Sequence, residues 1–138
     1  MKKNIKIIFW LLIVSFLFIL CQFFVPGLRD SFRGTAFFLG PMIIFFFFGL
    51  ALIVFTVREK VEGKLRKFLL LTGSAAAGFF AFVFLHNAFY ALNVVVGHIT
   101  ALNYLTEILG VIFFLIAIFV CPLGFLAGIV GTVYFLRK

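Results

Sequence analysis

Polar side chains occur between residues 73 and 92, in an apolar stretch where a lipid-facing helix would carry none. His86, Tyr90 and Asn93 follow one another at spacings of four and three residues, so a helix places them on one arc. Such an arc would suit an outward-facing polar cavity for a small solute, an ion or a lipid headgroup. With the polar residues expected in the same leaflet, the candidate cavity residues are Gln22, His86, Asn87, Tyr90, Asn93 and Glu107.

A packing role for His86 explains the same pattern without a cavity. A neutral imidazole is cheaper to bury in a membrane than a carboxylate or an ammonium group. His86 would then hydrogen-bond to Tyr90 or to a neighbouring helix and fix how the helices pack. The sequence leaves both interpretations open.

Patterns typical of enzymes and of metal or cofactor sites are missing. The expected spans hold no pair of carboxylates, and the chain contains no CxxC, HExxH, nucleophile elbow or phosphate-binding loop. Cys21 and Cys121 are expected at different depths, so we predict neither a disulfide nor a metal site from them. We therefore expect a protein that is not an enzyme and that uses no cofactor.

The elements that carry these residues are predicted to be membrane-spanning helices. Of the 138 residues, 66% are hydrophobic and 12% are charged, whereas soluble domains contain roughly a quarter charged residues. The net charge of +8 comes from basic residues at the ends of apolar runs, so we predict a multi-pass cell-membrane protein rather than a nucleic-acid partner.

Four charge-free runs predict four helices in one domain that covers residues 1–138, an all-α four-helix membrane bundle. A span needs about 20 apolar residues. The expected helices lie near residues 6–26, 36–57, 67–92 and 105–136. Residues 93–106 include Asn93, His98 and Asn103 and are expected to lie in the interface or to re-enter the membrane shallowly. The first helix lacks a small-residue cleavage site, and we expect it to be a retained span.

The distribution of Lys and Arg predicts the orientation. Ten of the twelve lie at the two termini and in residues 58–67, while Arg29 and Arg33 alone lie on the other side. Loops rich in basic residues stay in the cytoplasm. Both termini are therefore expected to be cytoplasmic.

Stripes of small residues mark the third and fourth helices. Small side chains let helix backbones approach closely, and this drives association in lipid. We expect the two stripes to face each other or a second subunit. The predicted packing residues are Gly73, Ala77, Ala81, Gly124, Gly128 and Gly131.

The segment LLLTGSAAAGFFAFVFLHNAFYAL, residues 69–92, resembles a pattern in small uncharacterised bacterial and archaeal four-helix membrane proteins. In these proteins a run of small residues precedes Leu-His-Asn and a Tyr in the third helix. The resemblance implies a four-helix membrane fold and carries no activity. Two functions follow as hypotheses: a membrane protein that packs with itself or with a larger membrane complex, and a small-solute or ion carrier that uses the polar layer around His86.

Overall fold

The computed structural model describes residues 3–137 and is helical throughout, with no strand in that range. Lys2 and Lys138, which contribute to the predicted charge asymmetry, lie outside the described residues. The α-helices are α1 (Lys3–Phe24), α2 (Pro26–Phe32), α3 (Gly40–Arg58), α4 (Gly63–Val96), α5 (Thr100–Leu115) and α6 (Cys121–Arg137). A short 3₁₀-helix, η1 (Ala36–Phe38), precedes α3, and a short π-helix, η2 (Ile116–Val120), joins α5 to α6.

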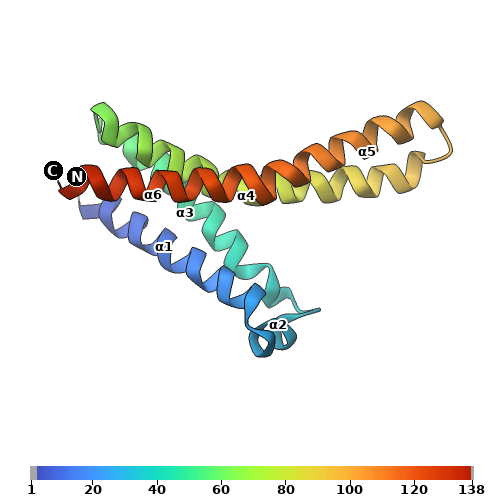
Figure 1. The fold of residues 1–138 in the computed structure, drawn as a ribbon, viewed down its shortest axis with the longest axis horizontal. Coiled ribbons are helices and arrows are strands. Elements are labelled where there is room, and N and C mark those ends of the chain that lie inside the picture. Colours follow the sequence, from blue (N-terminus) through green and yellow to red (C-terminus); the bar gives the residue numbers. More distant parts are fainter. Residues whose placement is uncertain (1–2, 138) are drawn as a thin grey trace.

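Within residues 3–137, four helices are long and apolar enough to cross a membrane, as predicted. They are α1, α3, α4 and the helix that α5, η2 and α6 form together, Thr100–Arg137. Figure 1 shows that α1 begins and α6 ends at the same end of the molecule. Helix α4 is central, because it packs against α3, α5 and α6, whereas α1 packs mainly against α3.

Proline and glycine set the limits of the first three helices. Pro26 follows the end of α1, and proline disfavours helical backbone in the residue before it. Pro41 lies in the first turn of α3, where its missing N–H has no helical partner to lose. Gly63, the first residue of α4, adopts a φ of +68°, a backbone conformation that glycine adopts without steric cost.

Residues 93–106 differ from the predicted interfacial connection. Helix α4 continues to Val96 and α5 begins at Thr100, so three residues connect them. The amide group of Asn93 donates to the carbonyl oxygen of Asn103 at 2.9 Å and to Thr106 Oγ1 at 2.9 Å. Asn93 and Asn103, two of the polar residues that suggested a connection, are thus hydrogen-bonded between two helices, and His98 lies in the short turn of a helical hairpin.

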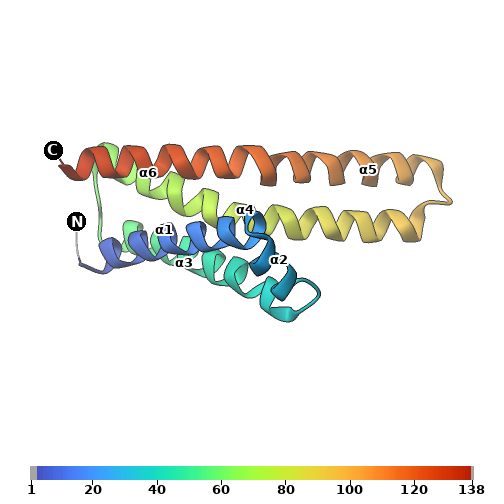
Figure 2. The ribbon, with the colours of Figure 1, turned by 60° about the horizontal axis from the view of Figure 1, so that its bottom comes forward.

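The hairpin of α4 and α5 extends past the ends of α1 and α3, as Figures 1 and 2 show. Helices α1 and α3 have 22 and 19 residues, which matches the ~20 residues that cross a bilayer. Helix α4 has 34 residues and the α5–α6 helix has 38. At 1.5 Å per residue they measure about 51 and 57 Å. Both lengths exceed the ~30 Å thickness of a hydrocarbon core.

Aromatic rings and small residues form the core. The ring of Phe125 on α6 lies 4.8 Å from that of Phe16 on α1 and 5.1 Å from that of Phe45 on α3, measured between centroids. Helices α1, α3 and α6 therefore meet at Phe125, which is 1% exposed.

The two small-residue stripes face different partners and not each other. A Cβ added at Gly73 would meet Gly49 and Ile53 of α3. On α6, Gly128 meets Thr72 and Gly131 meets Phe68, and both partners are on α4. Of the two predicted alternatives, contact between the stripes does not occur at these positions, because α4 packs on two sides: its stripe faces α3, and the α6 stripe faces another side of α4. Contact of a stripe with a second subunit stays a prediction.

Candidate functional site

His86 joins the two helices of the hairpin. Its Nδ1 lies 2.8 Å from the carbonyl oxygen of Gly110 on α5. Because a carbonyl oxygen can only accept, Nδ1 carries the proton in this hydrogen bond. The imidazole also packs against Phe114, with ring centroids 5.2 Å apart, and is half-buried. His86 thus makes a polar and an aromatic contact with the same neighbouring helix.

Asn93 makes the second polar contact between these helices, closer to the turn. Its Nδ2 lies 2.7 Å from Asn103 Oδ1, in addition to the bonds to the Asn103 carbonyl and Thr106. The hydroxyl of Thr106 donates to carbonyl oxygens of its own helix. This network joins α4 and α5 next to the turn of the hairpin.

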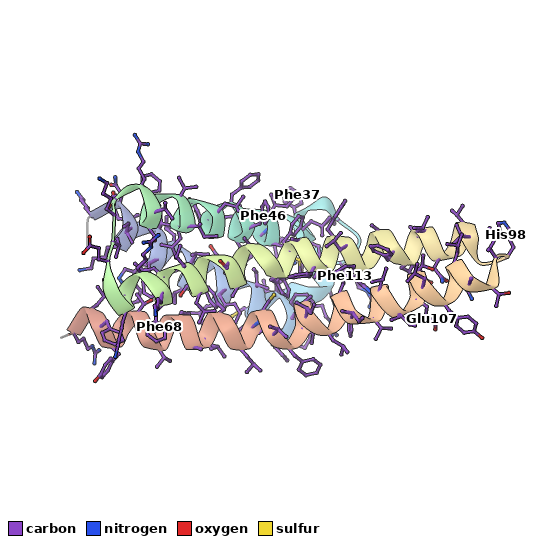
Figure 3. All side chains as sticks on the ribbon, turned by 90° about the horizontal axis from the view of Figure 1, so that it is seen from above. Phe37, Phe46, Phe68, His98, Glu107 and Phe113 are labelled. Carbon is purple, nitrogen blue, oxygen red and sulfur yellow. The ribbon has the colours of Figure 1, made fainter. Side chains whose placement is uncertain are left out.

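The remaining candidate residues are not brought into one group. Asn87 donates to the Val83 carbonyl of its own helix, and Tyr90 and Glu107 are exposed. Gln22, 1% exposed, belongs to the α1 end, where its amide donates to the Phe38 carbonyl at 3.0 Å. Its Oε1 has no hydrogen-bond partner among the described residues. Figure 3 shows His98 at the tip of the hairpin and Glu107 further back on α5.

The predicted packing residues are placed on α4 and α6. Gly73 and Ala77 are buried against α3, and Gly128 and Gly131 are buried against α4. Gly124 lies near Ala75, and Ala81 is half-buried.

Sequence reasoning missed the partners of the polar residues: Asn103, Thr106 and Gly110. Two of these partners, Asn103 and Gly110, could have been predicted from the sequence by assuming a helical hairpin with its turn at His98. His86 and Gly110 are equally distant from His98 along the chain, and so are Asn93 and Asn103. Two antiparallel helices that turn at His98 must bring these pairs to the same level.

A metal or disulfide site has no basis in the described residues. No three His, Cys, Asp or Glu side chains between residues 3 and 137 are close enough to hold a metal ion. Cys21 is an exposed free thiol, and Cys121 is a buried one.

Comparison with protein-family models, with curated proteins and with solved structures gave no match. The resemblance of residues 69–92 to small four-helix membrane proteins stays a prediction. The polar cavity around His86 also stays a prediction.

Proposed function

We propose that this chain is a non-enzymatic, multi-pass protein of the cell membrane that acts by packing with a second copy of itself or with a larger membrane complex. The observation that carries the proposal is the apolar surface of the α4–α5 hairpin, which extends beyond the other spans. Both termini are proposed to be cytoplasmic, and the excess of Lys and Arg at the termini and between α3 and α4 supports this orientation.

Tilt does not bring the whole hairpin into the hydrocarbon core. The stretch Thr100–Leu136 measures about 55 Å along its axis. To fit a hydrocarbon core of ~30 Å it would need to tilt by about 57°, beyond the ~40° limit of observed tilts. The hairpin tip therefore lies outside the hydrocarbon in this arrangement.

The tip exposes large apolar side chains rather than charges. Val94 and Val95 are 71% and 69% exposed, and Glu107 is the only charged residue between Lys67 and Arg137. Exposed apolar patches of this kind mark interaction surfaces. The exposed apolar side chains of the tip are Tyr90, Leu92, Val94, Val95, Ile99, Leu102, Tyr104, Leu105 and Ile108.

Burial of these apolar side chains by a partner protein would contribute enough free energy to favour binding. Fully burying one Val, Leu or Ile side chain contributes ~1.5–3 kcal/mol. The loss of rotational and translational freedom on binding costs ~4–15 kcal/mol. The apolar side chains of the tip are numerous enough to offset this cost when a partner covers most of them.

Site-specific photo-crosslinking tests the proposal in intact cells. A photoreactive amino acid at Val94 is expected to give a protein adduct, because the partner covers the tip. The matched control is Val130 on α6, which is 68% exposed and lies within the proposed bilayer thickness; it is expected to react with lipid. The mass of the adduct distinguishes a second copy from another protein. No protein adduct at Val94 would contradict the proposal.

A further inference from the structure

A shallow groove of about 380 Å³ runs along α1, at the end of the molecule where both termini lie (Figure 1). It is lined by Lys3, Lys6, Ile7, Trp10, Leu11 and Val14. These residues recur at spacings of three and four, so they share one face of the helix. From Lys3 to Val14 the helix rises by about 16 Å, half of a ~30 Å hydrocarbon core. The groove therefore has the length of one leaflet.

The groove lies on the side of α1 that faces away from the other helices. Ile5, Phe9 and Leu12 are fully buried in the bundle, and the helical spacing places them on the side opposite the groove. Trp10 is 50% exposed, and its indole makes an edge contact with Phe9, with centroids 5.9 Å apart. In a membrane, the groove is thus open to the surrounding lipid.

The groove changes from charged to apolar along its length. Lys3 and Lys6 line its first part, and Leu11 and Val14 line the part furthest from the N-terminus. A lysine stem lies along apolar surface while its ammonium group stays in the headgroup region. Trp10 lies between the two parts, and tryptophan is enriched at the level of the headgroups. A phospholipid has the same order of groups, a polar headgroup followed by a hydrocarbon chain.

The positive charge at this end of the molecule restricts the headgroup. Within residues 3–137, neither Lys3 nor Lys6 takes part in a salt bridge or a side-chain hydrogen bond. Glu59 and Glu62 are the carboxylates at this end, against eight described basic residues. These basic residues are Lys3, Lys6, Arg58, Lys60, Lys64, Arg66, Lys67 and Arg137. Basic residues next to a membrane attract anionic lipids, which are enriched in the cytoplasmic leaflet. Charge therefore favours an anionic headgroup over a zwitterionic one.

We propose that the groove on α1 binds an anionic phospholipid of the cytoplasmic leaflet, with the phosphate near the ammonium groups of Lys3 and Lys6 and one acyl chain along the apolar part. The indole N–H of Trp10 has no hydrogen-bond partner within residues 3–137 and is available to an oxygen of the headgroup. The inference rests on the membrane residence and orientation proposed above, but not on the partner of the hairpin. A missing protein adduct at Val94 would leave it standing.

Fluorescence quenching at Trp10 tests the preference for an anionic lipid, because Trp10 is the only tryptophan of the chain. The purified full-length protein is placed in nanodiscs that contain equal amounts of phosphatidylglycerol and phosphatidylcholine. Bromine on the acyl chains of one of the two lipids quenches a tryptophan that this lipid contacts. Brominated phosphatidylglycerol is expected to quench more strongly, with a relative affinity about fivefold higher, the factor for one basic residue near the headgroups. Equal quenching by the two lipids, or none by either, would overturn the proposal.

Matched pairs of substitutions locate the charges that select the lipid. Lys3→Gln with Lys6→Gln is expected to bring the relative affinity close to one, and Lys3→Arg with Lys6→Arg is expected to keep the preference. The control, Lys64→Gln with Lys67→Gln on α4, removes the same number of charges and is expected to keep the preference as well. All four lysines are exposed, so the fold does not depend on them. A preference that survives the first pair, or that the control also abolishes, would overturn the assignment to Lys3 and Lys6.

Discussion

Replacing Gly49 by Ala is expected to force α3 away from α4. An ideal Cβ at this position would lie 2.8 Å from the backbone nitrogen of Ala77 and 2.8 Å from the carbonyl oxygen of Gly73. Ordinary contacts of a Cβ begin at 3.4 Å, and because both neighbours are backbone atoms, the helices must separate by about 0.6 Å. A gap of this size removes about a quarter to a half of the dispersion energy of each affected contact.

The expected cost of Gly49→Ala follows from two opposing terms. Overpacking typically costs ~1–3 kcal/mol. Alanine offsets ~0.5–1 kcal/mol of this cost, because it loses less backbone conformational entropy than glycine when the helix forms. We therefore expect a net loss of about 0–2.5 kcal/mol in the free energy of unfolding, against no overpacking cost at a position with free space.

Reversible unfolding in mixed micelles, followed by circular dichroism, measures this loss. The control is Gly40→Ala in the same helix, where an added Cβ has nothing within 4 Å. This variant is expected to be as stable as the wild type or slightly more stable. If Gly49→Ala and Gly40→Ala unfold at the same denaturant concentration, the close approach of α3 and α4 at Gly49 is refuted.

Three further predictions concern the other spans and the orientation. Gly128→Leu is expected to cost on the order of 1–3 kcal/mol, measured by the same unfolding assay, because the added side chain meets the backbone of α4; wild-type stability would contradict it. Cysteines introduced at Val61 and His98 are expected to react with impermeant reagents from opposite sides of an intact membrane, and labelling of both from outside would exclude the proposed orientation. His86→Ala is expected to lower the thermal stability more than Asn87→Ala does, because only His86 contacts the neighbouring helix; a solute-uptake defect in a stable His86→Ala protein would instead favour the carrier hypothesis.

The sequence alone determined the number and composition of the long apolar helices. Charge-free runs decide this, because a charged side chain in hydrocarbon is costly wherever the helix packs. The breaks near Pro26 and Gly63 are also local, since they depend on backbone conformations that these residues favour or permit. These features require no knowledge of neighbouring helices.

Only the tertiary structure decided how far α4 and α5 extend and which residues meet. Asn93 and Asn103 are polar enough to suggest a loop, but polarity does not show whether a neighbouring helix satisfies a side chain. The small residues of α4 and α6 likewise predict close packing, but they do not show which helix each stripe contacts. Helix α4 packs against α3 on one side and against α6 on another. The partners of His86 and Gly73 therefore depend on the register between helices, which arises from side-chain packing across the whole bundle.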